Sequence, residues 1–281
     1  MQIHPAWLDW PETQTLIKAF GEKQQLRFVG GAVRDAVLDR RVQDVDAATP
    51  LRPEQVMQML TQAGIKVVPT GIDHGTVTAV IGKHHFEITT LRKDVATDGR
   101  HAKVAYTDDW QEDAARRDFT MNALYCDASG AVTDYFHGIE DAIAGHVRFI
   151  GDAATRIAED ALRILRFFRF FAHYGKAAID QQGLAACAKA AVTIDNLSGE
   201  RIQQEMMKLL VSARAADVVE LMQQHGIWER VVPSAVVVKS LARLPALLKK
   251  ANHAPDALLA LAVLIRSAKT DHDALINSIS S

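Results

Sequence analysis

The chain changes character near Gly151, and no other feature of the sequence constrains the fold as strongly. Before Gly151, short apolar segments that suit strands alternate with helical segments, and glycine and proline residues separate them. After Gly151, helical periods rich in alanine and leucine follow one another almost without interruption. We therefore predict an α+β fold, and a length of 281 residues at roughly 150 residues per domain favours about two domains.

Composition and apolar patterning favour a soluble globular protein with no membrane partner. Hydrophobic residues make up 48% of the chain and charged residues 23%. The longest apolar run, Ala257–Ile265, has nine residues, well below the roughly 18 that a membrane helix needs. Residues 1–20 lack a cationic segment followed by an apolar one. Two cysteines, Cys126 and Cys187, cannot form a disulfide framework, so we expect a cytoplasmic location.

The net charge of −2, from 32 basic and 34 acidic residues, excludes a global attraction to polyanions. Local excesses exist: Arg148 to Lys176 holds six basic and three acidic residues, and Lys239 to Lys250 holds four basic residues and no acid. Both segments are either solvated helix faces or local patches for a polyanion.

The first half predicts a strand over Leu26–Val29, a tight turn at Gly30-Gly31, a helix over Ala32–Leu38 and a strand over Val42–Ala48. Further on, we expect a hairpin formed by Thr76–Ile81 and His85–Leu91, a long polar connection from Arg92 to Asp113 with a turn at Asp98-Gly99, and one helix over Ala154–His173.

The Gly30-Gly31 turn can bring backbone N–H groups close to a ligand, and Arg34 follows one helical turn later. This arrangement suits a triphosphate. A glycine turn between strand and helix can also serve close packing alone. The segment has neither the Walker spacing nor the G-x-G-x-x-G spacing of dinucleotide folds.

Asp44 and Asp46 flank Val45 in a strand-like pattern, where residues two apart point to the same face at about 6 to 7 Å. Two carboxylates at this separation repel each other unless a cation lies between them, and oxygen ligands suit Mg²⁺ that carries phosphate oxygens. The alternative is a pair of solvated turn acids.

Four segments in this order give the chain a resemblance to a known family: Phe28–Asp35 (FVGGAVRD), the Asp44/Asp46 pair, Arg116–Asn122 (RRDFTMN) and Glu159–Arg163 (EDALR). Together they resemble the class II tRNA nucleotidyltransferases, or CCA-adding enzymes, and the similar bacterial poly(A) polymerases. The resemblance covers about residues 25–215. It implies a polymerase-β-like nucleotidyltransferase head over residues 1–150, an all-helical neck over 151–215 and a helical body over 216–281, and it leaves open whether that body is complete.

The same resemblance implies roles for individual residues. Asp44 and Asp46 would be catalytic and bind Mg²⁺, and Glu87 is a candidate third catalytic carboxylate. The nucleotide-binding residues of the head would be Gly30, Gly31, Arg34, Arg117 and Asn122. The neck helix would add Asp160, Arg163, Arg166 and Arg169 to the nucleotide-binding set.

An Asp160 and Arg163 pair can select a base because a carboxylate only accepts hydrogen bonds and a guanidinium only donates them. Cytosine and adenine both offer an amino donor beside a ring-nitrogen acceptor, whereas uracil and guanine offer a carbonyl acceptor beside a ring N–H. Residues 160, 163, 166 and 169 wind around an ideal helix, so they cannot all bind one base. We expect Arg166 to support the template or the phosphates, and Arg169 to contact the nucleotide or the RNA backbone. The interleaved phenylalanines, at positions 167, 168, 170 and 171, are expected in the neck core.

The resemblance therefore implies a tRNA nucleotidyltransferase that adds C, C and A to the tRNA 3′ end from CTP and ATP by two-metal phosphoryl transfer. Arg92 to Asp113 occupies the position of the family's flexible loop and is full length, which favours complete CCA addition. A poly(A) polymerase of the same family, or a noncatalytic RNA- or nucleotide-binding module, remains an alternative. The oligomeric state stays open.

Overall fold

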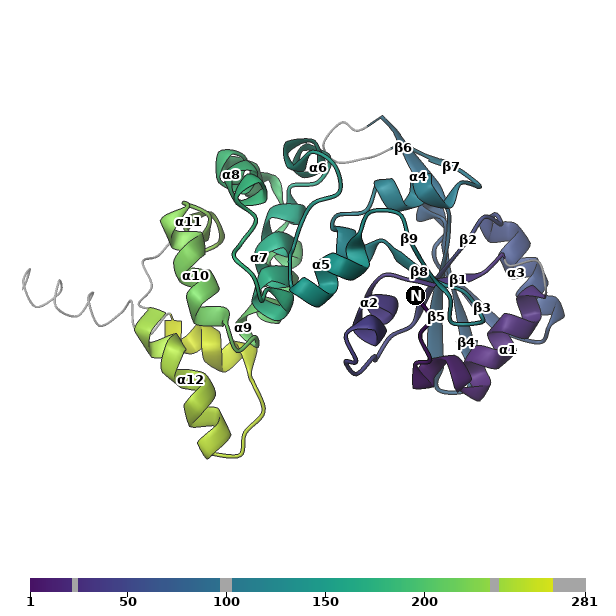
Figure 1. The fold of residues 1–281 in the computed structure, drawn as a ribbon, viewed down its shortest axis with the longest axis horizontal. Helices are drawn as coiled ribbons and strands as arrows, with labels where there is room; N and C mark the ends of the chain where they lie inside the picture. Colours follow the sequence, from purple (N-terminus) through teal and green to yellow (C-terminus); the bar gives the residue numbers. More distant parts are fainter. Residues whose placement is uncertain (22–24, 97–102, 233–237, 265–281) are drawn as a thin grey trace, which may run out of the picture. The chain divides into compact units, whose positions relative to one another are not determined.

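The computed structural model describes residues 1–21, 25–96, 103–232 and 238–264 (Figure 1). The chain forms two compact units, Met1–Asp152 and Ala153–Ser281. The first unit contains all the strands of the described residues and the second is helical, so the predicted α+β fold is confirmed. The division of the helical half into a neck and a body at residue 215 stays a prediction.

A seven-stranded mixed sheet forms the centre of the first unit, with the strand order β3-β4-β5-β2-β1-β8-β9. Only β2 and β5 run parallel; the other neighbours are antiparallel. Its strands are β1 (Arg27–Val29), β2 (Asp46–Thr49), β3 (Lys66–Gly71), β4 (Thr76–Ile81), β5 (His84–Thr90), β8 (Leu124–Cys126) and β9 (Val132–Asp134). A separate antiparallel pair consists of β6 (Arg92–Ala96) and β7 (Lys103–Tyr106).

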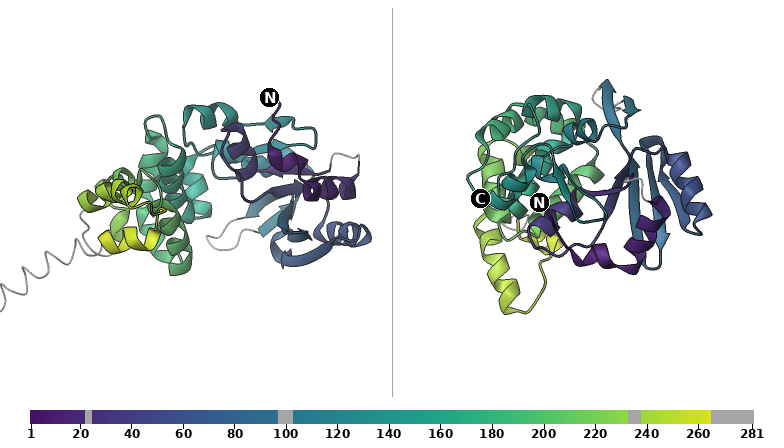
Figure 2. Two further views of the ribbon diagram at one scale, coloured as in Figure 1. Left: turned by 90° about the horizontal axis from the view of Figure 1, so that it is seen from below. Right: turned by 45° about the vertical axis from the view of Figure 1, so that its right-hand side comes forward.

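Helices between residues 6 and 62 pack on one face of the sheet, and the helix over Trp110–Ala115 packs on the opposite face through Ala114. The helical elements of this unit are η1 (Ala6–Asp9), α1 (Pro11–Phe20), α2 (Gly31–Val37), α3 (Pro53–Gln62), η2 (Ile72–His74), α4 (Trp110–Ala115), η3 (Thr120–Asn122) and α5 (Gly138–Ala144). In Figure 1 and in the right-hand view of Figure 2, α1 (purple) and α3 (blue) lie beside the strands.

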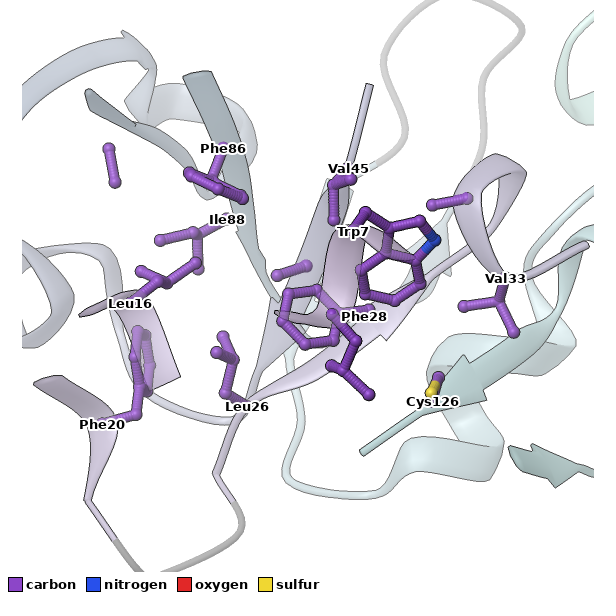
Figure 3. Close-up of a cluster of buried hydrophobic side chains, with 14 of the residues drawn as sticks. Trp7, Leu16, Phe20, Leu26, Phe28, Val33, Val45, Phe86, Ile88 and Cys126 are labelled. Carbon is purple, nitrogen blue, oxygen red and sulfur yellow. The ribbon is translucent and has the colours of Figure 1, made fainter. Parts of the chain in front are cut away.

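The larger core of this unit lies between the sheet and the helices η1, α1, α2 and α3 (Figure 3). Trp7 packs edge-on against Phe28 of β1, with 4.9 Å between the ring centroids. Phe86 and Ile88 of β5 join the same cluster. Each large apolar side chain that is fully buried contributes about 1.5–3 kcal/mol. Since side chains alternate along a strand, burying Phe86 and Ile88 turns Glu87, between them, toward the opposite face.

That opposite face carries a smaller core and the charged groups. Val29, Ala48 and Tyr125 pack there, on three neighbouring strands. Asp46, two residues before Ala48, lies on the same face and is exposed. The sheet thus separates a face covered by η1, α1, α2 and α3 from a face that carries the exposed acids beside a smaller core.

The second unit contains α6 (Ala153–Glu159), α7 (Leu162–Tyr174), α8 (Gln181–Lys189), η4 (Ala191–Asn196), α9 (Gly199–Leu210), α10 (Ala215–Gln224), α11 (Trp228–Val231) and α12 (Val238–Lys250). Residues 257–264 are also helical. Four phenylalanines of α7 are at most 6% exposed, which confirms their predicted place in the core: Phe167, Phe168, Phe170 and Phe171.

The predicted helix over Ala154–His173 is wrong, because α6 and α7 are separate helices with a break at residues 160 and 161. At the break, the carboxylate Oδ1 of Asp160 accepts a hydrogen bond from the N–H of Leu162 at 3.1 Å. An aspartate that bonds the backbone two residues later offers the chain an alternative to the helix. Asp160 therefore precedes α7, and the ideal-helix spacing from Asp160 to Arg163 does not hold.

Two other predicted elements differ in extent. The strand predicted over Val42–Ala48 begins only at Asp46, where it pairs with Val29 of the three-residue strand β1. The polar connection from Arg92 to Asp113 contains β6, β7 and most of α4, because backbone pairing needs no apolar pattern in the sequence. The predicted turn at Asp98-Gly99 lies outside the described residues.

Both cysteines, Cys126 and Cys187, are buried free thiols. In the parts of the chain that the structure describes, no helix is long and apolar enough to cross a membrane.

Candidate active site

The turn between β1 and α2 needs a glycine. Gly30 has φ = +71°, a backbone conformation that residues with a Cβ rarely adopt. Its N–H donates to the carbonyl of Leu124 on β8 at 3.2 Å, which fixes the turn to the sheet. A Cβ at Gly30 would lie 3.7 Å from Nη1 of Arg117, so this guanidinium lies beside the turn. The structure thus brings together Gly30 and Arg117, which lie far apart in the sequence.

Arg34 lies beneath the same turn and is only 6% exposed. Its Nε and Nη2 both donate to the carboxylate of Asp35 at 3.0 Å, and its Nη1 donates to Oδ1 of Asn122 at 2.6 Å. A Cβ at Gly31 would lie 3.6 Å from Nη2 of Arg34. Arg34, Asn122 and the glycine turn therefore form one group, in which protein acceptors already receive the hydrogen bonds of the guanidinium.

The acids gather on the open face of the sheet. Parallel pairing of β2 with β5 places Ala47 opposite Ile88, so Asp46 lies beside Glu87, one residue earlier on each strand. Asp44, Asp46 and Glu87 are exposed, while Val45 between the first two is buried. This pattern agrees with the prediction that the two acids share one face, although Asp44 lies before the strand.

Electrostatics also connects these acids. Desolvation by the surrounding residues, followed by the negative charges of Glu87 and Asp44, raises the pKa of Asp46 to about 6, and Arg117 acts in the opposite direction. Neighbouring carboxylates raise one another's pKa because their negative charges repel, and a bound cation would stabilise their charged forms. Asp46 therefore interacts electrostatically with both neighbouring acids and with Arg117.

The donor set fits a hard divalent cation. Among the described residues, no three histidine, cysteine, aspartate or glutamate side chains form a ready metal cluster. Magnesium is usually held by one or two carboxylates together with water and substrate phosphates, so a closed three-ligand cluster is not required. Asp44 and Asp46 supply oxygen ligands of this kind, with Glu87 beside Asp46.

Arg117 is held by Asp113 of α4 and Tyr125 of β8. Its Nη2 donates to Oδ2 of Asp113 at 3.0 Å, and its Nε donates to the hydroxyl of Tyr125 at 3.2 Å. Burial lowers the pKa of Arg117, but the nearby Tyr125 and Asp113 outweigh burial and raise it. The guanidinium is therefore charged and fixed in direction.

The segment from Arg116 to Asn122 is anchored by two further aspartates. Asp118 accepts hydrogen bonds from the N–H of Phe119 at 2.8 Å and from Nδ2 of Asn122 at 3.0 Å. Thr120 donates its hydroxyl to Asp141 of α5 at 2.6 Å, and Arg148 pairs with the same buried carboxylate. These contacts fix Asn122, and through it Arg34.

In the helical unit, the predicted Asp160 and Arg163 pair is not formed. Oδ2 of Asp160 accepts a hydrogen bond from Nη2 of Arg201 on α9 at 2.8 Å. Arg163 donates to the carbonyl of Arg156 at 2.7 Å and pairs with Glu159. The break in the helix gives the two residues separate partners, because Asp160 lies outside the regular turn of α7.

Arg166 and Arg169 share an acid from α9. Nε of Arg169 lies 2.6 Å from Oε2 of Glu205, and Nη1 of Arg166 lies 3.8 Å from Oε1. Glu205 is 5% exposed. Helix α9 thus supplies Arg201 to Asp160 and Glu205 to the two arginines, at positions four residues apart on one helix face.

Several residues of the site were not found from the sequence. Asp113 precedes Arg116 and Arg117 by three and four residues. This spacing of an acid and a base is common on exposed helices, so it is only a weak signal of a functional site. Tyr125 and Glu205 carry no local signal, since strand pairing and helix packing bring them to their partners. The charged groups can be identified from the sequence, but their partners depend on the tertiary structure.

Two family models match the chain. The first, described as the poly(A) polymerase head domain, covers residues 26–148. The second, described as a probable RNA- and SrmB-binding site of polymerase A, covers residues 178–237.

Curated relatives carry names from the same family. The mitochondrial CCA tRNA nucleotidyltransferase 1 of Danio rerio is 44% identical over 219 residues, which are 75% of this chain and 50% of the relative. The Homo sapiens counterpart is 46% identical over 207 residues, covering 71% of this chain and 47% of the relative. The CCA-adding enzyme of Oceanobacillus iheyensis is 43% identical over 184 residues, covering 65% and 45%. The chain spans about half the length of the curated relatives it matches.

Solved structures agree with these relatives. The CCA-adding enzyme of Bacillus stearothermophilus in complex with CTP matches 78% of this chain and 53% of its own, with 34% identity and a TM-score of 0.68. A tRNA nucleotidyltransferase complexed with a primer tRNA and an incoming ATP analog matches 89% of this chain and 74% of its own, with 25% identity and a TM-score of 0.69.

The fold and the acid-bearing sheet face define a head of the polymerase-β-like nucleotidyltransferase class. The chain belongs to the family of class II tRNA nucleotidyltransferases, or CCA-adding enzymes, and bacterial poly(A) polymerases.

Proposed function

We propose that the protein transfers nucleotides from CTP and ATP to the 3′ end of tRNA and releases pyrophosphate, adding C, C and A without a nucleic-acid template. The observation that carries this proposal is the group of Asp46, Glu87 and Asp44 on one sheet face, next to a glycine turn that Arg117 faces. The names of the relatives and the CTP and tRNA complexes of the similar structures support it.

Within this proposal, Asp44 and Asp46 hold Mg²⁺, and Glu87 is the third catalytic carboxylate. When bound, Mg²⁺ lowers the pKa of the attacking RNA hydroxyl and neutralises the triphosphate and the departing pyrophosphate. Arg117 donates hydrogen bonds to the phosphates beside Gly30 and Gly31. Arg34 and Asn122 support the turn from below, which keeps the phosphate site in one geometry.

In this proposal, the base is selected by charged residues of the helical unit. Asp160 accepts hydrogen bonds and Arg163 donates them, which suits cytosine and adenine and leaves uracil and guanine with unpaired groups. In the present structure both side chains have protein partners, so a nucleotide would exchange those partners for its base edge. Arg166 and Arg169, which Glu205 holds, would serve the phosphates, the template or the RNA backbone.

A poly(A) polymerase activity is the second candidate, because the two family models that match this chain both carry descriptions of that enzyme. The two activities need the same acids and differ in how many nucleotides they add and to which RNA. The expected cytoplasmic location stays a prediction, since the vertebrate relatives have mitochondrial names.

The test offers the purified protein Mg²⁺ and labelled CTP or ATP, with either a tRNA that ends before its CCA or an unrelated RNA primer. The expected product is a tRNA extended by C, C and A only. Long A tracts on both RNAs would favour the poly(A) alternative. A well-folded protein that binds RNA or nucleotide but extends neither primer would contradict the proposal and favour a noncatalytic binding module.

A further inference from the structure

Asp113 divides its carboxylate between two consecutive arginines. Oδ1 accepts a hydrogen bond from Nε of Arg116 at 3.0 Å, and Oδ2 accepts one from Nη2 of Arg117 at 3.0 Å. The backbone N–H of Arg92 also donates to Oδ1, at 3.2 Å. The side chain of Asp113 is 1% exposed. A buried carboxylate with this many donors is fixed in place and fixes its donors in turn.

Tyr125 joins the second oxygen of Asp113 to Arg117. Its hydroxyl donates to Oδ2 of Asp113 at 2.7 Å and accepts from Nε of Arg117 at 3.2 Å. The phenol is buried on the open face of the sheet, one residue from Leu124, which anchors the Gly30 turn. Burial raises the pKa of Tyr125, so the hydroxyl stays protonated and keeps donating to Asp113.

These contacts occupy two of the three nitrogens of Arg117 and leave the third facing the candidate site. Nε and Nη2 are bound to Tyr125 and Asp113, whereas Nη1 makes no hydrogen bond to the described residues and is the atom beside Gly30. A planar guanidinium held at two nitrogens has no freedom left to turn the third away. The same guanidinium acts on the charge of Asp46.

We propose that Asp113 and Tyr125 are positioning residues that aim Nη1 of Arg117 at the phosphates of the incoming nucleotide. This inference rests on the proposed function, since it assigns a direction to a nucleotide-binding arginine. A phosphate contact carries no information about the base, and both residues should therefore act equally on CTP and ATP.

Tyr125→Phe removes the hydroxyl and keeps the ring, so it tests the inference with little change in packing. We expect the KM for CTP and for ATP to rise by the same factor, about three- to tenfold, with kcat changed less than about twofold. The inhibition constant of inorganic triphosphate should rise by the same factor. Asp113→Asn should have a larger effect in the same direction, about tenfold or more, because it also removes the charge that holds Arg117.

A double-mutant cycle separates positioning from a structural role. In an Arg117→Ala background, Tyr125→Phe should change the KM by less than about twofold, because the arginine it acts through is gone. Tyr135→Phe is the matched control: Tyr135 follows β9, its hydroxyl lies 3.5 Å from Nη1 of Arg27 on β1, and its loss should leave the KM unchanged. Thermal unfolding of every variant shows that each assay measures folded protein.

The outcomes are distinct. If the effects of Tyr125→Phe and Arg117→Ala multiply, or if only one of the two nucleotides is affected, the inference is overturned. If the wild-type protein binds CTP in a calorimeter but extends no RNA, the proposed function fails, and the same cycle measured on CTP affinity still decides the inference.

Discussion

The first unit holds Arg117 in a buried network, whereas the helical unit binds Asp160 through an exposed ion pair. In the head, Arg117 is fixed by a buried carboxylate and a buried phenol, and one nitrogen is left toward the glycine turn. In the helical unit, Asp160 is bound by Arg201 in an ion pair whose side chains are 35% and 46% exposed. Buried networks hold a group in one geometry, whereas exposed ion pairs exchange partners at little cost.

Under the proposed function, the two regions have different tasks. Phosphates are common to all nucleoside triphosphates, so a fixed phosphate site serves every substrate. A base-reading site that accepts two different bases needs side chains that can change partners.

Asp46→Asn should reduce nucleotide incorporation by at least about 100-fold, because loss of even a residue that supports a metal ligand costs about 10–100-fold. The fold should remain, since the side chain of Asp46 is exposed. Single-turnover extension of a tRNA primer measures the effect, and circular dichroism checks the fold. Asp9→Asn, at an exposed aspartate next to α1, is the control with the same change in charge. Incorporation within tenfold of wild type would contradict the metal assignment.

Asp160→Asn should weaken base selection more than it weakens triphosphate binding. An amide presents a donor as well as an acceptor, so it can also pair with the carbonyl of uracil. We expect incorporation of UTP relative to CTP to rise by about 10–100-fold. Misincorporation assays with the four nucleoside triphosphates measure the ratio. Unchanged selectivity, together with a normal KM for CTP, would remove Asp160 from the base-reading site.

Asp113 should make the free energy of unfolding of the head depend on pH in the acidic range. Burial opposes the charged form, but Arg117, Arg116 and the hydroxyl of Tyr125 lower the pKa of Asp113 from 3.8 to about 2. A lowered pKa gives stability that is present above the ordinary value and is lost as the pH falls through the folded value. The contribution is on the order of 2 kcal/mol and should disappear between about pH 4 and pH 2.

Urea denaturation of the wild type and of Asp113→Asn at several pH values checks this. The difference in their free energies of unfolding should shrink as the pH falls through this range. A difference that stays constant with pH would show that Asp113 acts through packing and not through its charge.

Arg201→Ala should have the smallest effect and the opposite sign. Removing Arg201 frees Oδ2 of Asp160, so a nucleotide no longer competes with an exposed ion pair worth about 0.2–1 kcal/mol. The KM for CTP should fall by about two- to fivefold, with kcat unchanged. The control is Arg230→Ala, because it removes the exposed ion pair between Arg230 and Asp195 elsewhere in the helical unit. A higher KM in Arg201→Ala would mean that Arg201 itself binds the nucleotide or the RNA.

The sequence predicted the acid pair, the glycine turn and the aromatic core of α7 because each has a local signature. Apolar residues at helical spacing predicted the burial of the four phenylalanines, and the structure confirms it. The strand-like pattern predicted that Asp44 and Asp46 share a face, and both are exposed with Val45 buried between them, although the strand itself begins only at Asp46. The assigned catalytic and binding roles of these residues remain predictions.

The sequence failed where a side chain competes with the backbone or where pairing is remote. Helical periodicity runs through residue 160 without a change, yet the carboxylate of Asp160 bonds the N–H of Leu162 and interrupts the helix. The segment from Arg92 to Tyr106 has no apolar alternation, yet β6 and β7 within it pair through backbone hydrogen bonds.

The amino-acid sequence by itself determined which groups are available: two acids two residues apart, a glycine pair after a strand, and arginines spaced along the helical half. The tertiary structure decided which of them meet. Parallel pairing of β2 with β5 places Glu87 beside Asp46, antiparallel pairing of β1 with β8 brings Tyr125 to Arg117, and packing of α9 on α7 gives Asp160 and Arg169 their partners. The reason is that hydrogen bonds and ion pairs act over a few ångströms in space, whereas sequence patterns report only on neighbours along the chain.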